Sequence, residues 1–248
     1  MGKLSWRKLP DPWQGSASPP LIEAGEIHLF EMSLQVSGAA ELERWHRMLG
    51  ADEVERAKRF RQEKHRRRFI VARGKLRQVL GIYLALDSST LSFTYGPAGK
   101  PGLPGRTATN MAFNLSHSDE LAILAIARGL AIGVDVERVC VLAEFDELVE
   151  RFFSRRESEA FAKLPERIKP NAFFNLWTRK EALLKATGEG IAHCLNSVEV
   201  TFLPQEPTRL LAAPKHFGAV SDWGLRSLDI GNRYAAAIAF RSGNAEAL

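Results

Sequence analysis

Gly133-Val134-Asp135-Val136-Glu137 alternates apolar and acidic residues near the middle of this 248-residue chain. Successive side chains of a β-strand point to opposite faces, so the two valines share one face and the two acids share the other. The pattern predicts a strand over residues 131–137 with a carboxylate pair on one face. Two adjacent like charges in an apolar run are costly unless a positive group lies between them. A solvated strand at a sheet edge explains the same spacing, so both interpretations stay open here.

Helical character marks a second stretch, Trp177-Thr178-Arg179-Lys180-Glu181-Ala182-Leu183-Leu184-Lys185. Glu181 and Lys185 lie one turn apart on one face of that helix, a spacing that also forms an ordinary helix-stabilising ion pair. If Glu181 approaches Asp135 and Glu137, three carboxylate groups converge. Carboxylate oxygens are hard ligands that suit Mg²⁺, which usually shares its coordination sphere with substrate phosphates.

The third block is Phe113-Asn114-Leu115-Ser116-His117-Ser118. Together with the stretch at 133–137 and the W-x-x-K-E-A-x-x-K pattern at 177–185, it resembles the signature of the 4′-phosphopantetheinyl transferases, in their surfactin-synthetase-activating (Sfp-type) branch. Three motifs in the family's order make a more specific match than any one of them. The resemblance spans residues 50–190, and the ends match only in general pattern.

The resemblance implies an α+β fold of two similar subdomains, related by a pseudo-two-fold axis, with the active site in the cleft between them. The sequence carries a weak echo of such a repeat, because residues 121–128 resemble 234–241 and Arg59-Phe60 resembles Arg151-Phe152. Coincidence between alanine-rich strands is the alternative explanation. We therefore predict an irregular, proline-rich N-terminal arm over 1–24, one α+β subdomain over 25–129 and a second over 130–248.

Hydrophobic periodicity predicts the same order in each half: a strand, then helices, then three strands. The strands expected in the first half are 26–32, 91–95, 111–116 and 121–127, the last two joined as a hairpin. The helices expected there are 39–49 and 51–84, with a break near Gly50. The helices expected in the second half are 143–150, 155–163 and 170–187, the last ended by Gly188 and Gly190. The strands expected after them are 197–203, 223–229 and 233–240.

Positive charge crowds residues 56–77, which hold eleven lysines and arginines. Such a run forms a solvated helix face, a phosphate site or a nucleic-acid-binding patch. A basic nucleic-acid-binding module that uses the 56–77 helix is therefore the alternative function. It explains the charge but leaves the three acids unexplained, because carboxylates repel a nucleic-acid backbone.

Members of the resembled family bind coenzyme A, whose phosphates need cationic partners. Arg68 aligns with a phosphate-binding arginine of the family and Arg73 is a second candidate; arginine binds phosphate oxygens with two parallel donors. Lys100 matches the family's Gly-Lys-Pro loop and is expected near the nucleotide end of coenzyme A. The third block contributes Asn114, Ser116 and His117 as further expected contacts, although a histidine after a strand is often purely structural.

The resemblance implies a reaction in which a carrier-protein serine attacks the β-phosphorus of coenzyme A, takes its 4′-phosphopantetheine group and releases 3′,5′-ADP. Asp135, Glu137 and Glu181 are expected to hold Mg²⁺. Glu181 is also expected to remove the hydroxyl proton, directly or through a metal-bound water. Lys185 is expected to bind the pyrophosphate and to counter the charge that develops on it.

The sequence predicts less specific roles for Trp177, Lys180 and residues 152–156. Trp177 is expected to pack and to fix its helix, whereas Lys180 either contributes charge or faces solvent. The apolar and basic residues near 152–156 form a candidate surface for a carrier helix, and buried phenylalanines at a helix start explain them equally well. Those residues are Phe152, Phe153, Arg155 and Arg156.

A formal charge of +5 and an isoelectric point near 9.4 favour an anionic partner. Coenzyme A and an acidic acyl or peptidyl carrier protein are the expected partners, with no nucleic acid and no membrane. Cys140 and Cys194 are too few for a disulfide framework or a cysteine metal site. No apolar run approaches the roughly 20 residues that span a bilayer, and the N-terminus lacks an apolar signal-peptide core. We therefore expect a cytoplasmic monomer.

Overall fold

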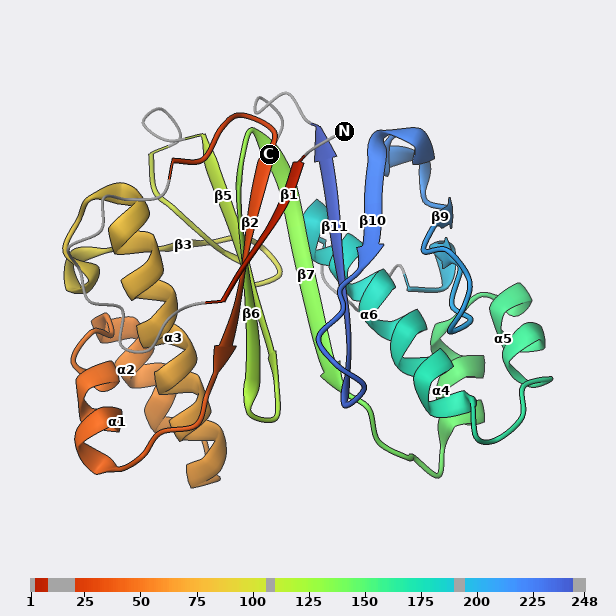
Figure 1. Cartoon of the computed structure of the whole chain (residues 1–248), viewed down its shortest axis with the longest axis horizontal. Helices are drawn as coiled ribbons and strands as arrows, with labels where there is room; N and C mark the ends of the chain where they lie inside the picture. The colour runs from red at the N-terminus through yellow and green to blue at the C-terminus, as the bar shows by residue number, and fades with distance from the viewer. Residues whose placement is uncertain (1–2, 9–20, 106–109, 190–194, 243–248) are drawn as a thin grey trace.

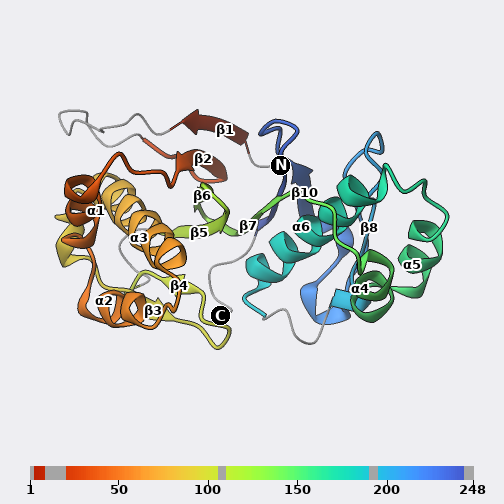
Figure 2. The same cartoon turned by 90° about the horizontal axis from the view of Figure 1, so that it is seen from below.

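The computed structural model describes residues 3–8, 21–105, 110–189 and 195–242 (Figure 1). Strands occupy the middle of the molecule and helices cover its two outer sides, as the perpendicular view in Figure 2 also shows. Each half of the chain supplies one of the two larger sheets and one group of helices. This is the α+β fold of two similar subdomains that the sequence predicts.

The first half forms a four-stranded sheet in the order β1-β2-β6-β5. Its antiparallel strands are β2 (Glu26–Ser33), β6 (Leu121–Arg128) and β5 (Met111–Ser118). Its helices are α1 (Ala39–His46), α2 (Ala51–Lys58) and α3 (Glu63–Leu84). A short pair, β3 (Thr94–Tyr95) and β4 (Pro101–Gly102), lies between α3 and the β5–β6 hairpin along the chain.

The second half forms a three-stranded antiparallel sheet in the order β10-β11-β7. Its strands are β7 (Leu130–Arg138), β10 (Trp223–Ser227) and β11 (Tyr234–Ser242). Its helices are α4 (Phe145–Phe152), α5 (Arg155–Phe161) and α6 (Lys169–Thr187). A second short pair consists of β8 (Glu199–Val200) and β9 (Leu210–Ala212).

The two halves repeat one topology. In each half the last strand of the repeat lies in the centre, between the first strand and the strand that precedes it in the chain. The spatial orders are therefore β2-β6-β5 and β7-β11-β10. β6 and β11 are therefore equivalent, and they contain the two segments that resemble each other in sequence, 121–128 and 234–241. The shared topology indicates that this echo reflects an internal repeat rather than coincidence.

The sheets pack against each other through their inner faces, and this contact explains the apolar run of β6. Ile123 and Ala125 join the core between the sheets, whereas Leu124 and Ile126 join the core that includes α3. Because both faces of β6 are covered, its residues do not alternate with polar ones. β7 contributes Val134 and its neighbours at alternate positions to the inner core, so its acids lie on the opposite face.

A buried glutamate ties a short helix to the long helix in each half. Glu53 accepts a hydrogen bond from the backbone N–H that precedes α2 and forms ion pairs with Arg73 and Arg77 of α3. Glu157 accepts from the backbone N–H that precedes α5 and pairs with Lys180 of α6 at 2.5 Å. In both halves the glutamate therefore caps one helix and neutralises a buried cation of another.

The prediction of one helix over 51–84 is wrong, because α2 ends at Lys58 and α3 begins at Glu63. The connecting residues contain neither glycine nor proline, so the local sequence gives no sign of the turn. Tertiary contacts hold it instead: Glu53 pairs with α3, and the ring of Phe60 packs on that of Phe69 at a centroid distance of 5.3 Å.

The prediction of an irregular arm over 1–24 is wrong for Lys3–Lys8, which form β1, parallel to β2. β2 pairs with β6 on one side only, and β1 supplies hydrogen-bonding partners for the edge that is left. Residues 9–20 of the predicted arm and Gly190 lie outside the described residues. The strand predicted at 197–203 is shorter, and β9 was not predicted.

The turns follow the expected chemistry. α6 is capped at its C-terminus by Gly188, whose backbone is in the left-handed region with φ of 80°. Gly129, also left-handed at φ of 72°, joins β6 to β7 at the expected junction of the halves. Within the described ranges, none of the helices is both long and apolar enough to cross a membrane.

Candidate active site

α6 lies directly against the acidic face of β7 because Gly133 has no side chain. A Cβ atom at Gly133 would lie 2.1 Å from the carbonyl oxygen of Ala182 and 2.4 Å from the backbone nitrogen of Ala186. Both contacts are with helix backbone, which has little room to move. The glycine therefore permits the close approach that brings Glu181 and Lys185 over the strand.

Lys185 is the positive group that the paired carboxylates require. Its Nζ lies 2.6 Å from Asp135 Oδ1 and donates to Ser116 Oγ at 3.0 Å and to the carbonyl oxygen of Val134 at 3.3 Å. Ser116 donates its own proton to the same Asp135 oxygen at 2.8 Å. A residue from each of β5, β7 and α6 thus meets at one carboxylate.

Two carboxylate oxygens of the site are buried without a hydrogen-bond partner among the described residues, Asp135 Oδ2 and Glu181 Oε1. The two residues are only 3% and 2% exposed. Leaving a buried charged acceptor unpaired costs about 1–3 kcal/mol or more. These two oxygens are therefore available to accept from a ligand.

The three acids influence one another electrostatically. Burial raises the pKa of Glu181 to about 7, and the negative charges of Asp135 and Glu137 add to that rise while Lys185 opposes it. Burial also raises the pKa of Glu137, with the Asp135 charge adding to the effect and the Ser118 hydrogen bond opposing it. All three carboxylates therefore belong to one site.

The acids are nevertheless not drawn together into a cluster able to hold a metal ion by itself; over the described ranges no three acidic, histidine or cysteine side chains form one. Asp135 is held by Lys185, and Glu137 accepts a hydrogen bond from Ser118 at 2.7 Å. Like charges repel, so each carboxylate lies against its own protein donor. The full convergence expected from the sequence is not seen in this arrangement.

His117 follows Ser116 on β5 and lies in a positive field. Removal of water by the surrounding protein, together with the charges of Lys185, Arg68, His65 and Arg56, holds the pKa of its imidazole below the usual value. Positive charge from α2, α3 and α6 therefore reaches the same side chain. An anion such as a phosphate is the group that such a field attracts.

Lys100 reaches from the loop between β3 and β4 to the second half of the chain. Its Nζ donates to the carbonyl oxygens of Ile132 at 2.9 Å and of Lys185 at 2.6 Å. Burial, with the nearby charge of Lys185, lowers the pKa of Lys100 to about 8. Lys100 thus links the loop between β3 and β4 to β7 and α6, with its ammonium group bound to two backbone carbonyls.

The other predicted coenzyme A contacts have protein partners. Arg68 forms ion pairs with Asp119 at 2.5 Å and with Glu120 at 2.6 Å, both in the β5–β6 hairpin. Arg73 is buried against Glu53 in the first half, and the Oδ1 of Asn114 accepts from the backbone of β7 at 2.8 Å. A phosphate at Arg68 has to compete with two carboxylates.

Comparisons with known proteins identify the family of this chain. A model described as the 4′-phosphopantetheinyl transferase superfamily matches residues 131–239, and a 4′-phosphopantetheinyl transferase N-terminal model matches residues 37–128. The 4′-phosphopantetheinyl transferase HetI of Nostoc sp. is 40% identical over 215 residues, which cover 86% of this chain and 87% of HetI. The chain belongs to the 4′-phosphopantetheinyl transferase superfamily. The 4′-phosphopantetheinyl transferase Sfp of Bacillus subtilis is 30% identical over 161 residues, or 64% of this chain and 69% of that protein.

Trp177 and Lys180 of the transferase have structural environments. Trp177 packs as predicted, with its ring stacked on Phe173 at a centroid distance of 5.9 Å and in edge contact with Phe152 and Phe153. Lys180 is fully buried in its ion pair with Glu157, so it does not face solvent. The two phenylalanines of the candidate carrier surface thus contribute to packing around Trp177.

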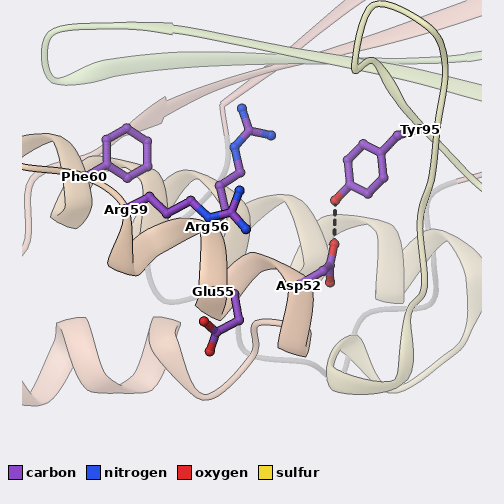
Figure 3. Close-up of a pocket in the computed structure, with 6 residues that line it drawn as sticks. All are labelled: Asp52, Glu55, Arg56, Arg59, Phe60 and Tyr95. Atoms are coloured by element: carbon purple, nitrogen blue, oxygen red, sulfur yellow. Dashed lines mark hydrogen bonds between the residues drawn. The ribbon is translucent and has the colours of Figure 1, made fainter.

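Sequence reasoning missed a cavity of about 630 Å³ in the first half of the transferase. Figure 3 shows residues of α2 and the turn after it on one side and Tyr95 of β3 on the other, with the tyrosine hydroxyl bonded to Asp52 at 2.9 Å. The six lining residues are Asp52, Glu55, Arg56, Arg59, Phe60 and Tyr95. Both arginines belong to the basic run of 56–77, and Tyr95 of β3, which is remote in the sequence, completes the lining of the cavity.

Proposed function

We propose that this chain transfers 4′-phosphopantetheine from coenzyme A to a serine of an acyl or peptidyl carrier protein, in a Mg²⁺-dependent reaction that releases 3′,5′-ADP. The observation that carries the proposal is a pair of buried oxygens, Asp135 Oδ2 and Glu181 Oε1, that have no hydrogen-bond partner in the described ranges, at a site where Lys185 holds Asp135. Both acids lie within the segment that the superfamily model matches.

The chemistry of the donor set fits a magnesium ion, although the three side chains do not converge over the described ranges. Asp135, Glu137 and Glu181 would hold it, because hard carboxylate oxygens are its usual protein ligands and two of these side chains have oxygens that lack a partner among the described residues. When bound, the ion supplies positive charge that neutralises the pyrophosphate and stabilises the leaving oxygen. It would also lower the pKa of Glu181, which burial and neighbouring acids have raised.

The protein groups supply orientation and proton transfer. The serine oxygen of the carrier forms a bond to the β-phosphorus, and the bond from that phosphorus to the bridging oxygen breaks, so that 3′,5′-ADP leaves with the electron pair. Glu181 accepts the hydroxyl proton directly or through water. Lys185, held by Asp135 and Ser116, faces the pyrophosphate as a preorganised cation.

Coenzyme A, in this proposal, lies across the junction of the halves. Ser116 and Lys185 contact Asp135, Lys100 binds the backbones of β7 and α6, and His117 lies in the positive field of Lys185. Arg68 is the candidate for the 3′-phosphate. Arg56 and Arg59 add two cations at the cavity, and the charge of Arg56 acts on His117. Asn114 and Arg73 are left as structural residues, because their polar atoms are used by β7 and Glu53.

An acidic carrier protein would meet a transferase of formal charge +5, and complementary charge speeds such encounters. The proposal also includes a cytoplasmic location, since two cysteines in 248 residues are typical of a protein from a reducing compartment.

Intact-mass spectrometry of an apo carrier protein tests the proposal. Incubation with the chain, coenzyme A and Mg²⁺ should add one phosphopantetheine group to the carrier, and EDTA should abolish the addition. A panel of acyl and peptidyl carriers covers the choice of partner, and Glu181→Gln is the inactive control. A chain that modifies none of the panel and also fails to bind coenzyme A in calorimetry would overturn the proposal.

A further inference from the structure

Side chains of β5, rather than its backbone, accept hydrogen bonds from the backbone N–H groups along the edge of β7 that faces β5. β5 and β7 are edge strands of separate sheets. Oxygens at alternate β5 positions accept from alternate β7 backbone N–H groups: Asn114 Oδ1 from Val134 at 2.8 Å, Ser116 Oγ from Val136 at 3.4 Å, and Ser118 Oγ from Arg138 at 3.0 Å. The two strands therefore run parallel in one register, and their period of two matches the pleat.

The two serines of this side-chain ladder each have a second partner, which is an acid of the site. Ser116 donates to Asp135 Oδ1 at 2.8 Å, and Ser118 donates to Glu137 Oε2 at 2.7 Å. A serine hydroxyl has one proton and two lone pairs. Because the backbone N–H of β7 can only donate, each hydroxyl is left to direct its proton at a carboxylate.

Ser118 differs from Ser116 in what it contacts. Ser116 also accepts from Lys185, so its substitution would disturb several groups at once. Among the residues that the structure describes, the Ser118 hydroxyl hydrogen-bonds to one side chain, that of Glu137, and to the backbone N–H of Arg138. Glutamate has three rotatable side-chain bonds, and one hydrogen bond to a fixed strand selects among their rotamers.

We propose that Ser118 is a positioning residue, which restricts the rotamers of Glu137 and keeps its carboxylate on the face of β7 that also carries Asp135, where both would bind a divalent cation. This inference rests on the proposed function, because it assigns Glu137 to the cation. Ser118 does not touch the reacting atoms; it acts through Glu137, and the effect of its removal depends on that glutamate. Donors that orient metal-binding carboxylates typically contribute about 10–100-fold to metal affinity.

Mn²⁺ binding to the purified full chain, without coenzyme A or carrier, tests this role by electron paramagnetic resonance and calorimetry. Ser118→Ala should raise the Kd for Mn²⁺ about tenfold, and Ser118→Thr, which keeps the hydroxyl, should restore most of the affinity. The matched control is Ser227→Ala at the end of β10, the strand equivalent to β5. Ser227 bonds to Arg179 and Thr208, away from the acids, so its variant should bind Mn²⁺ as the parent does.

A double-mutant cycle separates positioning from a general effect on the fold. Ser118→Ala should change the Kd for Mn²⁺ in the parent and should change it little when Glu137 is already glutamine. The inference would be overturned if Ser118→Ala left the Kd for Mn²⁺ unchanged, or if it raised that Kd equally in the parent and in Glu137→Gln. Ser118 would then only connect the two sheets. A parent chain that binds no Mn²⁺ would instead overturn the metal assignment of the proposed function and this inference with it.

Discussion

Lys180 and Glu181 are neighbours on α6 and both are buried, yet their surroundings differ in one respect. Lys180 pairs with Glu157 at 2.5 Å and donates to the Leu195 carbonyl at 2.8 Å, and the oxygens of Glu157 also accept from backbone N–H groups. Glu181 has a buried oxygen with no partner in the part of the chain that the structure describes. A fully paired buried charge stabilises the fold, whereas an incompletely paired one is held at a cost that a ligand can repay.

The two halves of the molecule show the same contrast on a larger scale. The strand register, combined with the internal repeat, places Phe30 and Met32 of β2 at the positions that Asp135 and Glu137 occupy on β7. Phe30 and Met32 are almost fully buried in the core that includes α3. One half thus uses this face for packing and the other for carboxylates, so a shared topology does not imply a shared role.

Removing the paired lysine should give the largest effect on stability. Lys180→Met leaves Glu157 buried without its cation, and breaking a buried pair in this way costs about 3–5 kcal/mol of unfolding free energy. Urea denaturation measures the loss. The exposed substitution Lys163→Met is the control, and adding Glu157→Gln to Lys180→Met should recover part of the stability. A Lys180→Met variant as stable as Lys163→Met would break the comparison.

Removing the unpaired acid should affect activity instead. Glu181→Gln should slow phosphopantetheine transfer by about 10²–10³-fold, the usual effect of losing one preorganised electrostatic group. Its unfolding free energy at pH 7 without metal should equal or exceed that of the parent, because a neutral amide replaces an acid that burial destabilises. Steady-state kinetics test the expected loss of activity, and urea denaturation tests the expected stability. A strong destabilisation with normal turnover would reverse the contrast with Lys180.

The pH dependence of stability should report the same group. The pKa of Glu181 is raised in the folded chain from 4.5 to about 7, so its contribution is fully present below about pH 4.5 and is lost as the pH rises through about 7. This corresponds to a fall of about 3 kcal/mol in unfolding free energy over that window. Denaturation at a series of pH values in EDTA should show this fall, and Glu181→Gln should lack it. Identical profiles for the two proteins would exclude the assignment.

Arg68 should give the smallest effect, because two carboxylates already hold it. Arg68→Ala should raise the KM for coenzyme A by about tenfold, equivalent to about 1.4 kcal/mol, and should change the KM for 3′-dephospho-coenzyme A much less. The control is Arg66→Ala, which removes an exposed arginine of the same helix that pairs with Glu63. If Arg68→Ala changed the KM values for both substrates equally, Arg68 would only stabilise the β5–β6 hairpin and would not bind the 3′-phosphate.

Local patterns predicted the elements that form the site, and they did so for physical reasons. The period of two over 131–137 shows which face of β7 is apolar, and the one-turn spacing of Glu181 and Lys185 places both on one face of α6. These signals lie within a few residues of each other along the chain. The turn between α2 and α3 has no such signal, because contacts with residues far along the chain hold it.

The sequence by itself determined the two-half α+β order, the acidic face of β7 and the motif residues that identify the superfamily. Only the tertiary structure decided which cation meets which acid: Lys180 pairs with Glu157 and Lys185 with Asp135, although both lysines belong to one motif. It also decided that Ser118 binds Glu137 and that Arg68 binds the β5–β6 hairpin. Charge partners depend on distances set by packing between remote segments, such as the approach of α6 to Gly133, and no local spacing encodes those distances.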